Sequence, residues 1–388
     1  MPESPQPAAA SEEQNPKTPT RSVQPLCGTS AVHGSGTDAP VPAHYGAPTR
    51  EQRRLLGGRA VVDLEHLELL DVHGPDALTW LTTITSQVFT GRAVGESARM
   101  AVLSPQGRVE HMADVVITAE DGALLICDAG CRAGLRRYLE MMRFASRVEI
   151  IDRDDLRVLG ATVPEALERA GGPALEAVAV HIDHWPDVAP GGVAYGPDPE
   201  DPVGAVLIVV READARAATW SPDHLAGMLA WEATRIADHR ARQSTEVDDR
   251  AIPHELDLLR QWVHTAKGCY RGQETVAKVM NLGQPPRRLV MLHLDGSQDA
   301  PIAAGGEVRL GGADGKVVGR VTSAGIHVDF GPIALAVIKR AVPVDAALSA
   351  QMLIHGTSGS EDSVWLDAAQ EPVVLEREHG KRPPTARL

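Results

Sequence analysis

A single thiol stands between two cations in the glycine-rich stretch Lys267–Glu274, which reads KGCYRGQE. Lys267 lies two residues before Cys269, and Arg271 lies two residues after it. The two glycines allow a positive φ or a close approach of the backbone to a neighbour. Residues 274–280 are predicted to form a short helix, so Cys269 is expected just before a helix N-terminus. Both the cations and the helix start favour the thiolate, which is the reactive form of cysteine.

Other interpretations of these side chains stay open. The same residues can form an ordinary surface turn with an inert thiol. A Cys–His hydrolase would use Cys269 with His264 or His254, but no oxyanion hole or orienting third group is recognisable. No second Cys or His has metal-ligand spacing to Cys269, and the pair His181 and His184 is more typical of a loop than of a metal site. No metal is therefore predicted.

The Cys-containing stretch resembles the K-G-C-Y-x-G-Q-E signature of the YgfZ family, which comprises folate-binding relatives of the glycine-cleavage T-protein, GcvT. The resemblance continues through residues 275–289 and covers about residues 43–347. It implies an α+β fold, a GcvT-like three-domain ring of two α+β domains with a C-terminal small β-barrel and a folate pocket near its centre. Further matching segments are Val72–Ala77, Leu103–Arg108, Trp231–Ile236, Ile252–Leu256, Val318–Ser323 and Gly331–Leu335.

The resemblance also implies a function. It is that of a folate-binding protein that supports iron–sulfur cluster assembly or repair and so affects tRNA modification indirectly. Tetrahydrofolate is the implied cofactor, iron–sulfur proteins are the implied clients, and the reactive site is Cys269 with Lys267 and Arg271. An arginine can pair with the glutamate tail of folate through two hydrogen bonds. The expected folate-binding residues are Arg235, Trp231, Tyr270, Gln273 and Glu274.

An acidic pair distinguishes the main alternative, a tetrahydrofolate-dependent aminomethyltransferase or methyltransferase. The aminomethyltransferase branch carries this pair in the strand after a Gly-Gly turn. Counted from Gly107, the pair falls on Glu110 and His111, so one acid is replaced by histidine. The replacement argues against glycine cleavage but not against folate binding, and whether the protein turns over any substrate is left open. A third class is a scaffold with neither folate nor a reactive thiol.

Composition excludes several classes of protein. The chain has 388 residues, enough for two or three domains, and 43% of them are apolar. Its 52 acids and 38 bases give a net charge of −14, which argues against binding to nucleic acid or to an anionic membrane. The chain shows no transmembrane run or secretory signal, and its four cysteines do not make a disulfide framework. A cytoplasmic location is expected, and a monomer is among the expected states.

Hydrophobic periodicity and turn residues predict the elements. The predicted helices are 49–56, 76–84, 133–143, 161–170, 221–239 and 274–280. The predicted strands are 60–64, 67–72, 99–103, 109–118, 123–127, 148–152 and 203–210, followed by the barrel strands 289–294, 307–310, 316–324, 333–339 and 364–366. The predicted domains are a disordered tail (1–42), a GcvT-like folate-binding domain (43–155 plus 221–283), a second α+β domain (156–220), a β-barrel (284–375) and a loose tail (376–388).

Overall fold

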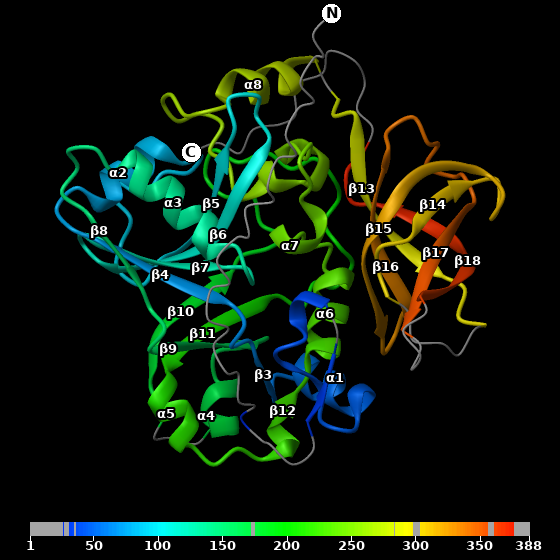
Figure 1. The fold of residues 1–388 in the computed structure, drawn as a ribbon, viewed down its shortest axis with the longest axis horizontal. Coiled ribbons are helices and arrows are strands. Elements are labelled where there is room, and N and C mark those ends of the chain that lie inside the picture. The colour runs from blue at the N-terminus through cyan, green and yellow to red at the C-terminus, as the bar shows by residue number, and fades with distance from the viewer. Residues whose placement is uncertain are drawn as a thin grey trace, which may run out of the picture.

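A computed structural model shows two five-stranded sheets and a closed barrel (Figure 1). It describes residues 26, 31–34, 36–171, 175–282, 284–297, 303–355 and 361–375. The predicted tail 376–388 and most of the predicted tail 1–42 lie outside the described residues. In the described ranges, no helix is long and apolar enough to cross a membrane.

The first sheet is antiparallel, with the strand order β5-β6-β7-β4-β8. Its alternating side chains divide between two cores. Leu125 faces α2 (Ala77–Ile84) and α3 (Arg132–Met142), which cover one face, whereas Leu124 faces the second sheet. The strand bounds are β4 (Glu68–His73), β5 (Ser97–Leu103), β6 (Val109–Ala119), β7 (Gly122–Cys127) and β8 (Glu149–Asp152).

The second sheet has the order β10-β11-β9-β3-β12 and packs on the first through a shared apolar core. Its strands are β3 (Val61–Asp63), β9 (Leu156–Ala161), β10 (Ala177–Asp183), β11 (Ala205–Arg211) and β12 (Leu225–Ala226). The helices beside it are α1 (Pro48–Leu56), α4 (Ala166–Gly171) and α5 (Glu212–Ala217). Because β3 and β12 come from segments predicted as the first domain, strand pairing crosses the predicted domain boundaries.

The predicted β-barrel is confirmed as a closed six-stranded barrel with the order β13-β16-β15-β14-β17-β18. Its strands are β13 (Arg287–Leu294), β14 (Glu307–Leu310), β15 (Lys316–His327), β16 (Gly331–Lys339), β17 (Leu348–His355) and β18 (Glu361–Pro372). β17 was not predicted. The barrel lies to one side of the two sheets, and α6 (Met228–Ala237) packs against β15 at the junction (Figure 1).

Two sequence predictions are wrong in part. The helix predicted over 221–239 is interrupted, because Leu225–Ala226 pairs in parallel with Val61–Val62 and only α6 continues as an α-helix. Before this pairing, Ser221 caps a single 3-10 turn, η2 (Pro222–His224). The end of the predicted disordered tail is structured: it forms β1 (Val32–His33), η1 (Gly36–Asp38) and β2 (Pro42–His44), with Val41 fully buried.

Short elements after α6 carry the chain to the cysteine. They are α7 (Gln243–Glu246), η3 (Pro253–Leu256), η4 (Leu258–Arg260) and α8 (Gln273–Leu282). α8 lies at the tip of the β5–β6 hairpin in Figure 1. The signature stretch leads into the first turn of α8 and contacts the first sheet.

Candidate functional site

A cavity of about 120 Å³ lies between the two sheets and α6. Its apolar wall includes the indoles of Trp231 and Trp262. Its polar wall carries equal numbers of acids and arginines, so each charge has an opposite charge nearby. The acids are Asp114, Asp128, Asp183 and Glu232, and the arginines are Arg99, Arg235, Arg240 and Arg242.

Arg99 connects one side of this wall. Its Nε donates to Asp114 Oδ1 at 2.7 Å, and its Nη2 donates to Asp183 Oδ2 at 2.7 Å. The guanidinium carbon lies 4.2 Å from the ring centroid of Trp262. Burial raises the pKa of Asp183, but Arg99 and Arg240 outweigh it and hold that pKa below its usual value. This side of the cavity is therefore rigid and ionised.

A histidine on β10 of the second sheet contacts β6 of the first. His181 Nδ1 is 3.3 Å from the carbonyl oxygen of Val115, and Nε2 is 3.3 Å from Asp114 Oδ1. Burial lowers the pKa of His181. In the described part of the chain, no group of His, Cys, Asp and Glu side chains has the arrangement of a metal site. His181 and His184 thus have no additional ligand in that part, and the pair carries no metal assignment.

Arg242 connects the opposite side of the cavity wall. Its Nη2 donates to Asp128 Oδ1 at 2.7 Å and to Asp38 Oδ1 at 2.9 Å, and its Nη1 donates to Glu232 Oε1 at 3.2 Å. Asp38 belongs to the N-terminal segment, so this segment helps to hold a residue of the wall in place. Burial raises the pKa of Asp38, but His66 and Arg242 outweigh it and lower that pKa well below its usual value.

Arg235, the predicted folate arginine, lines the cavity but has protein partners at all three guanidinium nitrogens. Nε and Nη2 donate to Glu232 at 2.9 and 2.8 Å. Nη1 donates to Glu246 at 3.0 Å and to the Arg240 carbonyl at 2.5 Å, and Nη2 also donates to Ser323 Oγ at 2.5 Å. Since Ser323 lies on β15, Arg235 joins α6 and α7 to the barrel.

Five buried polar atoms of cavity-lining residues have no hydrogen-bond partner among the described residues, and three of them lie within salt-bridge distance of a carboxylate. The other two have no such neighbour. They are Arg240 Nε and His66 Nδ1. Buried polar groups are nearly always hydrogen-bonded, so such atoms are expected to meet a ligand or water. Together with the indole walls, they suit a flat, apolar molecule that carries hydrogen-bonding groups at its edge.

The cysteine loop is fixed to α2 by Lys267. The Lys267 ammonium donates to the carbonyl oxygen of Thr85 at 2.6 Å and to that of Gln87 at 3.3 Å, and it also contacts the carbonyl oxygen of Thr82. These carbonyls lie at the C-terminal end of α2, where a cation is favourable. Burial lowers the pKa of Lys267 to about 8. The side chain is therefore a structural anchor of the loop, in addition to any effect on the thiol.

A second set of contacts fixes the other end of the loop. Gly272 has φ +84° and packs on the turn before β6, because a Cβ there would lie 2.6 Å from the Ser104 carbonyl oxygen. Gly107, with φ +74°, packs in turn on Thr275. Arg271 Nη1 donates to Glu110 Oε2 at 2.8 Å. Two of the segments that carry the family resemblance, the signature stretch and Leu103–Arg108, are therefore in direct contact.

Cys269 lies exposed at the apex of this anchored loop. Its Sγ has no hydrogen-bond partner in the described ranges, and α8 begins four residues later at Gln273. Tyr270 is buried in the core beneath the loop, 5.4 Å from the Lys267 ammonium, and burial raises its pKa. No residue from Lys267 to Glu274 lines the cavity.

The structure thus separates the predicted site residues into two groups. Trp231 and Arg235 lie at the cavity. The remaining residues lie in the outer loop or at the start of α8; they are Cys269, Lys267, Arg271, Tyr270, Gln273 and Glu274. The folate-binding role of Tyr270, Gln273 and Glu274 stays a prediction, and the cavity wall gives it no support.

The histidines of the hydrolase alternative have other neighbours. His254 Nε2 is 3.2 Å from the Val276 carbonyl oxygen, and the His264 ring packs against Gly191. Neither is hydrogen-bonded to Cys269 in the described part of the chain. Glu110 and His111 do not line the cavity either. Burial and Arg271 lower the pKa of His111 to about 4, so His111 is neutral at pH 7.

Several cavity residues were not predicted from the sequence. Asp114 and Asp183 are acids within mostly apolar strands, a pattern that indicates either an edge or a buried ion pair. Arg99 occupies a similar position in β5. The sequence shows these charged residues within apolar strands, but it does not reveal which acids pair with which arginines.

Comparison with known proteins gives relatives of two kinds. A chloroplastic protein from Arabidopsis thaliana with the provisional name of a transferase is 26% identical over 274 residues, covering 69% of this chain and 62% of that protein. The aminomethyltransferase of Chromobacterium violaceum is 25% identical over 154 residues, covering 39% of this chain and 42% of the relative. The chain thus spans between 42% and 62% of the length of these two relatives.

A human protein named as the mitochondrial iron–sulfur cluster assembly factor IBA57 is 26% identical over 286 residues, covering 66% of this chain and 72% of the relative. The crystal structure of the glycine cleavage system aminomethyltransferase T from Bartonella henselae superposes with a TM-score of 0.63 at 18% identity, over 90% of this chain and 96% of that one. No protein-family model matches the chain. The chain is homologous to the aminomethyltransferase superfamily. The predicted GcvT-like fold is confirmed, whereas the YgfZ branch of the superfamily stays a prediction.

Proposed function

We propose that the protein binds a tetrahydrofolate in the central cavity and uses Cys269 to support iron–sulfur cluster assembly or repair in client proteins. The observation that carries this proposal is the separation of an outward-facing thiol from a cavity lined by both sheets and α6. A small molecule suits the cavity, and a macromolecular client suits the loop. Effects on tRNA modification would follow indirectly from clusters in the modifying enzymes.

The composition of the cavity supports the folate half of the proposal. A pterin is flat and aromatic, and its amino and N–H groups donate to carboxylates such as Asp114 and Glu232. Trp231 and Trp262 provide aromatic surface, and Arg240 Nε is a buried donor with no partner among the described residues. Bound tetrahydrofolate would supply a carrier for one-carbon units. Because Arg235 has five protein acceptors, its role is to fix Glu232 in place.

The loop geometry supports the thiol half of the proposal. Lys267, Gly272 and Arg271 fix the loop at both ends, whereas Cys269 lies exposed between them. A thiol held in this way is accessible to an iron–sulfur cluster of another protein. Cysteine thiolates ligate the iron of such clusters. The similarity to a human iron–sulfur cluster assembly factor points to the same activity.

A folate-dependent aminomethyltransferase or methyltransferase is the second candidate. The similarity to aminomethyltransferases and the cavity itself favour it. Against it, Glu110 is paired with Arg271, and His111 is half-buried and neutral outside the cavity wall. The acid of β6 that lines the cavity is instead Asp114.

The test combines binding with rescue of a deletion strain. Tetrahydrofolate titrated into the purified protein should change Trp fluorescence with saturation at one equivalent. Cys269→Ser should bind tetrahydrofolate within twofold of the parent, yet fail to restore cluster-enzyme activity in the deletion strain. Full rescue by Cys269→Ser would remove the thiol from the function. Loss of glycine cleavage with intact cluster enzymes in the deletion strain would favour the transferase.

A further inference from the structure

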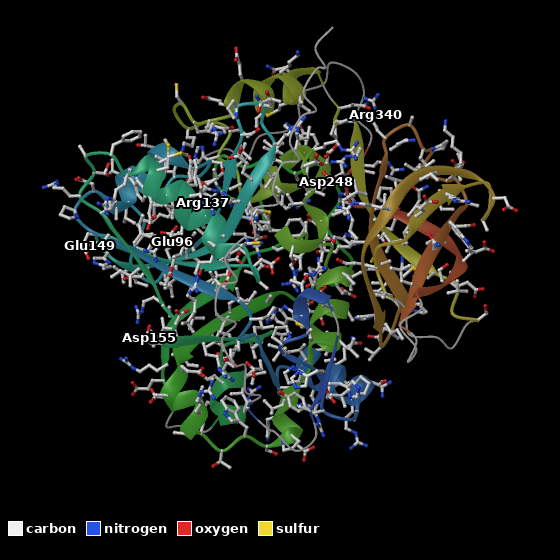
Figure 2. All side chains as sticks on the ribbon, in the orientation of Figure 1. Glu96, Arg137, Glu149, Asp155, Asp248 and Arg340 are labelled. Carbon is white, nitrogen blue, oxygen red and sulfur yellow. The ribbon has the colours of Figure 1, made fainter. Side chains whose placement is uncertain are left out.

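An outward strip on α3 and the two residues that follow it combines apolar and cationic side chains. Met141 is 61% exposed and Phe144 is 83% exposed, the largest exposed fraction among the large apolar residues that the structure describes. Arg137 and Arg143 are exposed beside them. Figure 2 labels Arg137 on α3, on the side of the first sheet away from the barrel. These four residues are called the α3 strip below.

The backbone of Phe144 is held in an unfavourable conformation. Its φ is +42°, in the left-handed region that side chains other than glycine rarely adopt. That conformation costs about 1–2 kcal/mol for a residue with a Cβ. The Met142 carbonyl, two residues earlier, accepts a 3.0 Å hydrogen bond from Trp80 Nε1, which fixes the start of the turn. An exposed ring in this conformation contributes no burial to the fold that would offset the cost, which indicates a role in binding.

The arginines near the strip fall into two groups. Three have carboxylate partners: Arg132 with Asp154, Arg136 with Asp152 and Arg147 with Asp76, each at 2.7 Å. Arg137 and Arg143, in contrast, have no ion-pair partner among the described residues. The strip is therefore a local surplus of positive charge on a chain whose net charge is −14. Such a surplus attracts a carboxylate-bearing surface.

The buried side of α3, opposite the strip, packs against the elements that hold the cysteine loop. Tyr138, next to Arg137, donates its hydroxyl to the Ile84 carbonyl at 2.7 Å, at the end of α2 that Lys267 anchors. The Tyr138 ring lies 6.2 Å from that of His111, and the Arg271 guanidinium is close enough to lower the pKa of His111. α3 therefore joins the strip on its outer side to the supports of the cysteine loop on its buried side.

We propose that the α3 strip is the docking surface for the protein clients of Cys269. The partner is a protein whose contact face carries carboxylates around an exposed aliphatic side chain. Its carboxylates pair with Arg137 and Arg143, while Met141 and Phe144 pack on its aliphatic group. This inference rests on the proposed function of Cys269 and names the chemistry of its client.

A protein suits the strip better than a lipid surface. An open hollow of about 630 Å³ lies beside Phe144, with Pro75 and Val148 in its wall. A partner side chain can fill a hollow, whereas a bilayer presents no projecting group of that shape. The net charge of −14 also opposes approach to an anionic membrane.

The experiment uses the full chain in the deletion strain. The double variant Arg137→Glu/Arg143→Glu is compared with Arg50→Glu/Arg53→Glu, which reverses two exposed arginines of α1. The α3 variant should reduce rescue of cluster-enzyme activity at least tenfold, and the α1 variant should leave it within twofold. Unfolding temperature and tetrahydrofolate affinity should stay unchanged in both, which separates lost docking from lost folding. Full rescue by the α3 variant overturns the proposal.

A photo-crosslinking amino acid at position 141 then identifies the occupant. The expected product is an acidic iron–sulfur protein whose crosslink is lost when Arg137→Glu/Arg143→Glu is introduced and when salt is raised. A crosslink to lipid, or to a second copy of this chain, overturns the proposal. If Cys269→Ser restores cluster-enzyme activity as fully as the parent does, the proposed function has failed. If Cys269→Ser abolishes rescue while the α3 variant does not, only the docking surface has failed.

Discussion

The cavity and the cysteine loop contrast in how they use charge. Around the cavity, Arg99, Arg235 and Arg242 have several carboxylate partners each, and most of these groups are buried. Around the loop, Lys267 is held by backbone carbonyls, Arg271 pairs with one half-exposed acid, and the thiol between them is open. The cavity is preorganised for a small polar molecule, whereas the loop presents a single reactive atom outward. One chain thus separates ligand binding from reactivity.

The largest expected effect tests whether Arg235 is structural. Arg235→Met should lower the free energy of unfolding by about 3–5 kcal/mol, because it leaves Glu246 buried without its cation. Denaturant unfolding monitored by circular dichroism measures the change. A stable Arg235→Met variant that has lost only tetrahydrofolate binding would show that Arg235 binds the ligand and is not a structural residue.

Removal of the Lys267 anchor should loosen the loop without affecting the cavity. Lys267→Met leaves the C-terminal carbonyls of α2 without a charged donor, a loss of about 1.5–3 kcal/mol in local stability. Amide hydrogen exchange of residues 265–272 should accelerate by at least tenfold, and tetrahydrofolate affinity should stay within twofold. Unchanged exchange would show that the glycine contacts alone hold the loop.

Two acids of β6 provide a test of the cavity and its matched control. Asp114 and Glu110 lie on one strand and each pairs with an arginine, but only Asp114 lines the cavity. Asp114→Asn should weaken tetrahydrofolate binding about tenfold, or by about 1.4 kcal/mol, whereas Glu110→Gln should change it less than twofold. Trp fluorescence titration provides the measurement. Equal effects of the two variants would contradict the assignment of the cavity.

The smallest effect concerns pH. The pKa of His111 is lowered to about 4 by burial and Arg271, so the unfolded chain takes up its proton at a higher pH than the folded one does. Stability is therefore lost as pH falls from about 6.5 to about 4. Partial solvent exposure limits the contribution of His111 to about 1 kcal/mol. Relative to the parent, His111→Gln should flatten the decline of unfolding free energy over this range. Parallel curves of unfolding free energy against pH for the two proteins would contradict this contribution of His111.

The sequence predicted elements whose signal is local. The alternation in Val109–Ala119 and the apolar run in Ala205–Arg211 identified β6 and β11. β17 was missed because Ser349, Ala350 and Gln351 have weak strand propensity despite their alternation. The interruption at Leu225–Ala226 depends on pairing with residues more than 150 positions earlier, which no local pattern reveals.

The candidate site was less predictable than the fold. The thiol loop was found because its residues are adjacent in sequence, and its exposure agrees with a reactive role. The cavity is built by single residues from both sheets and α6, so the sequence alone did not identify Arg99, Arg240 and Arg242 as part of it. Arg235 illustrates the limit: its position at the cavity was expected, but its five acceptors come from α6, α7 and β15 and from the segment after α6. Such partners are set by tertiary packing.

Asp38 has a practical implication for the laboratory. This residue, near the start of the described chain, reaches Arg242 and His66 on the cavity wall. A polypeptide shortened to begin at α1 would lack that carboxylate, and Arg242 would reorient toward Asp128 and Glu232 alone. Affinities measured on a trimmed polypeptide would then describe an altered pocket. A purification tag is therefore better placed at the C-terminus, with the N-terminal segment that carries Asp38 left unchanged.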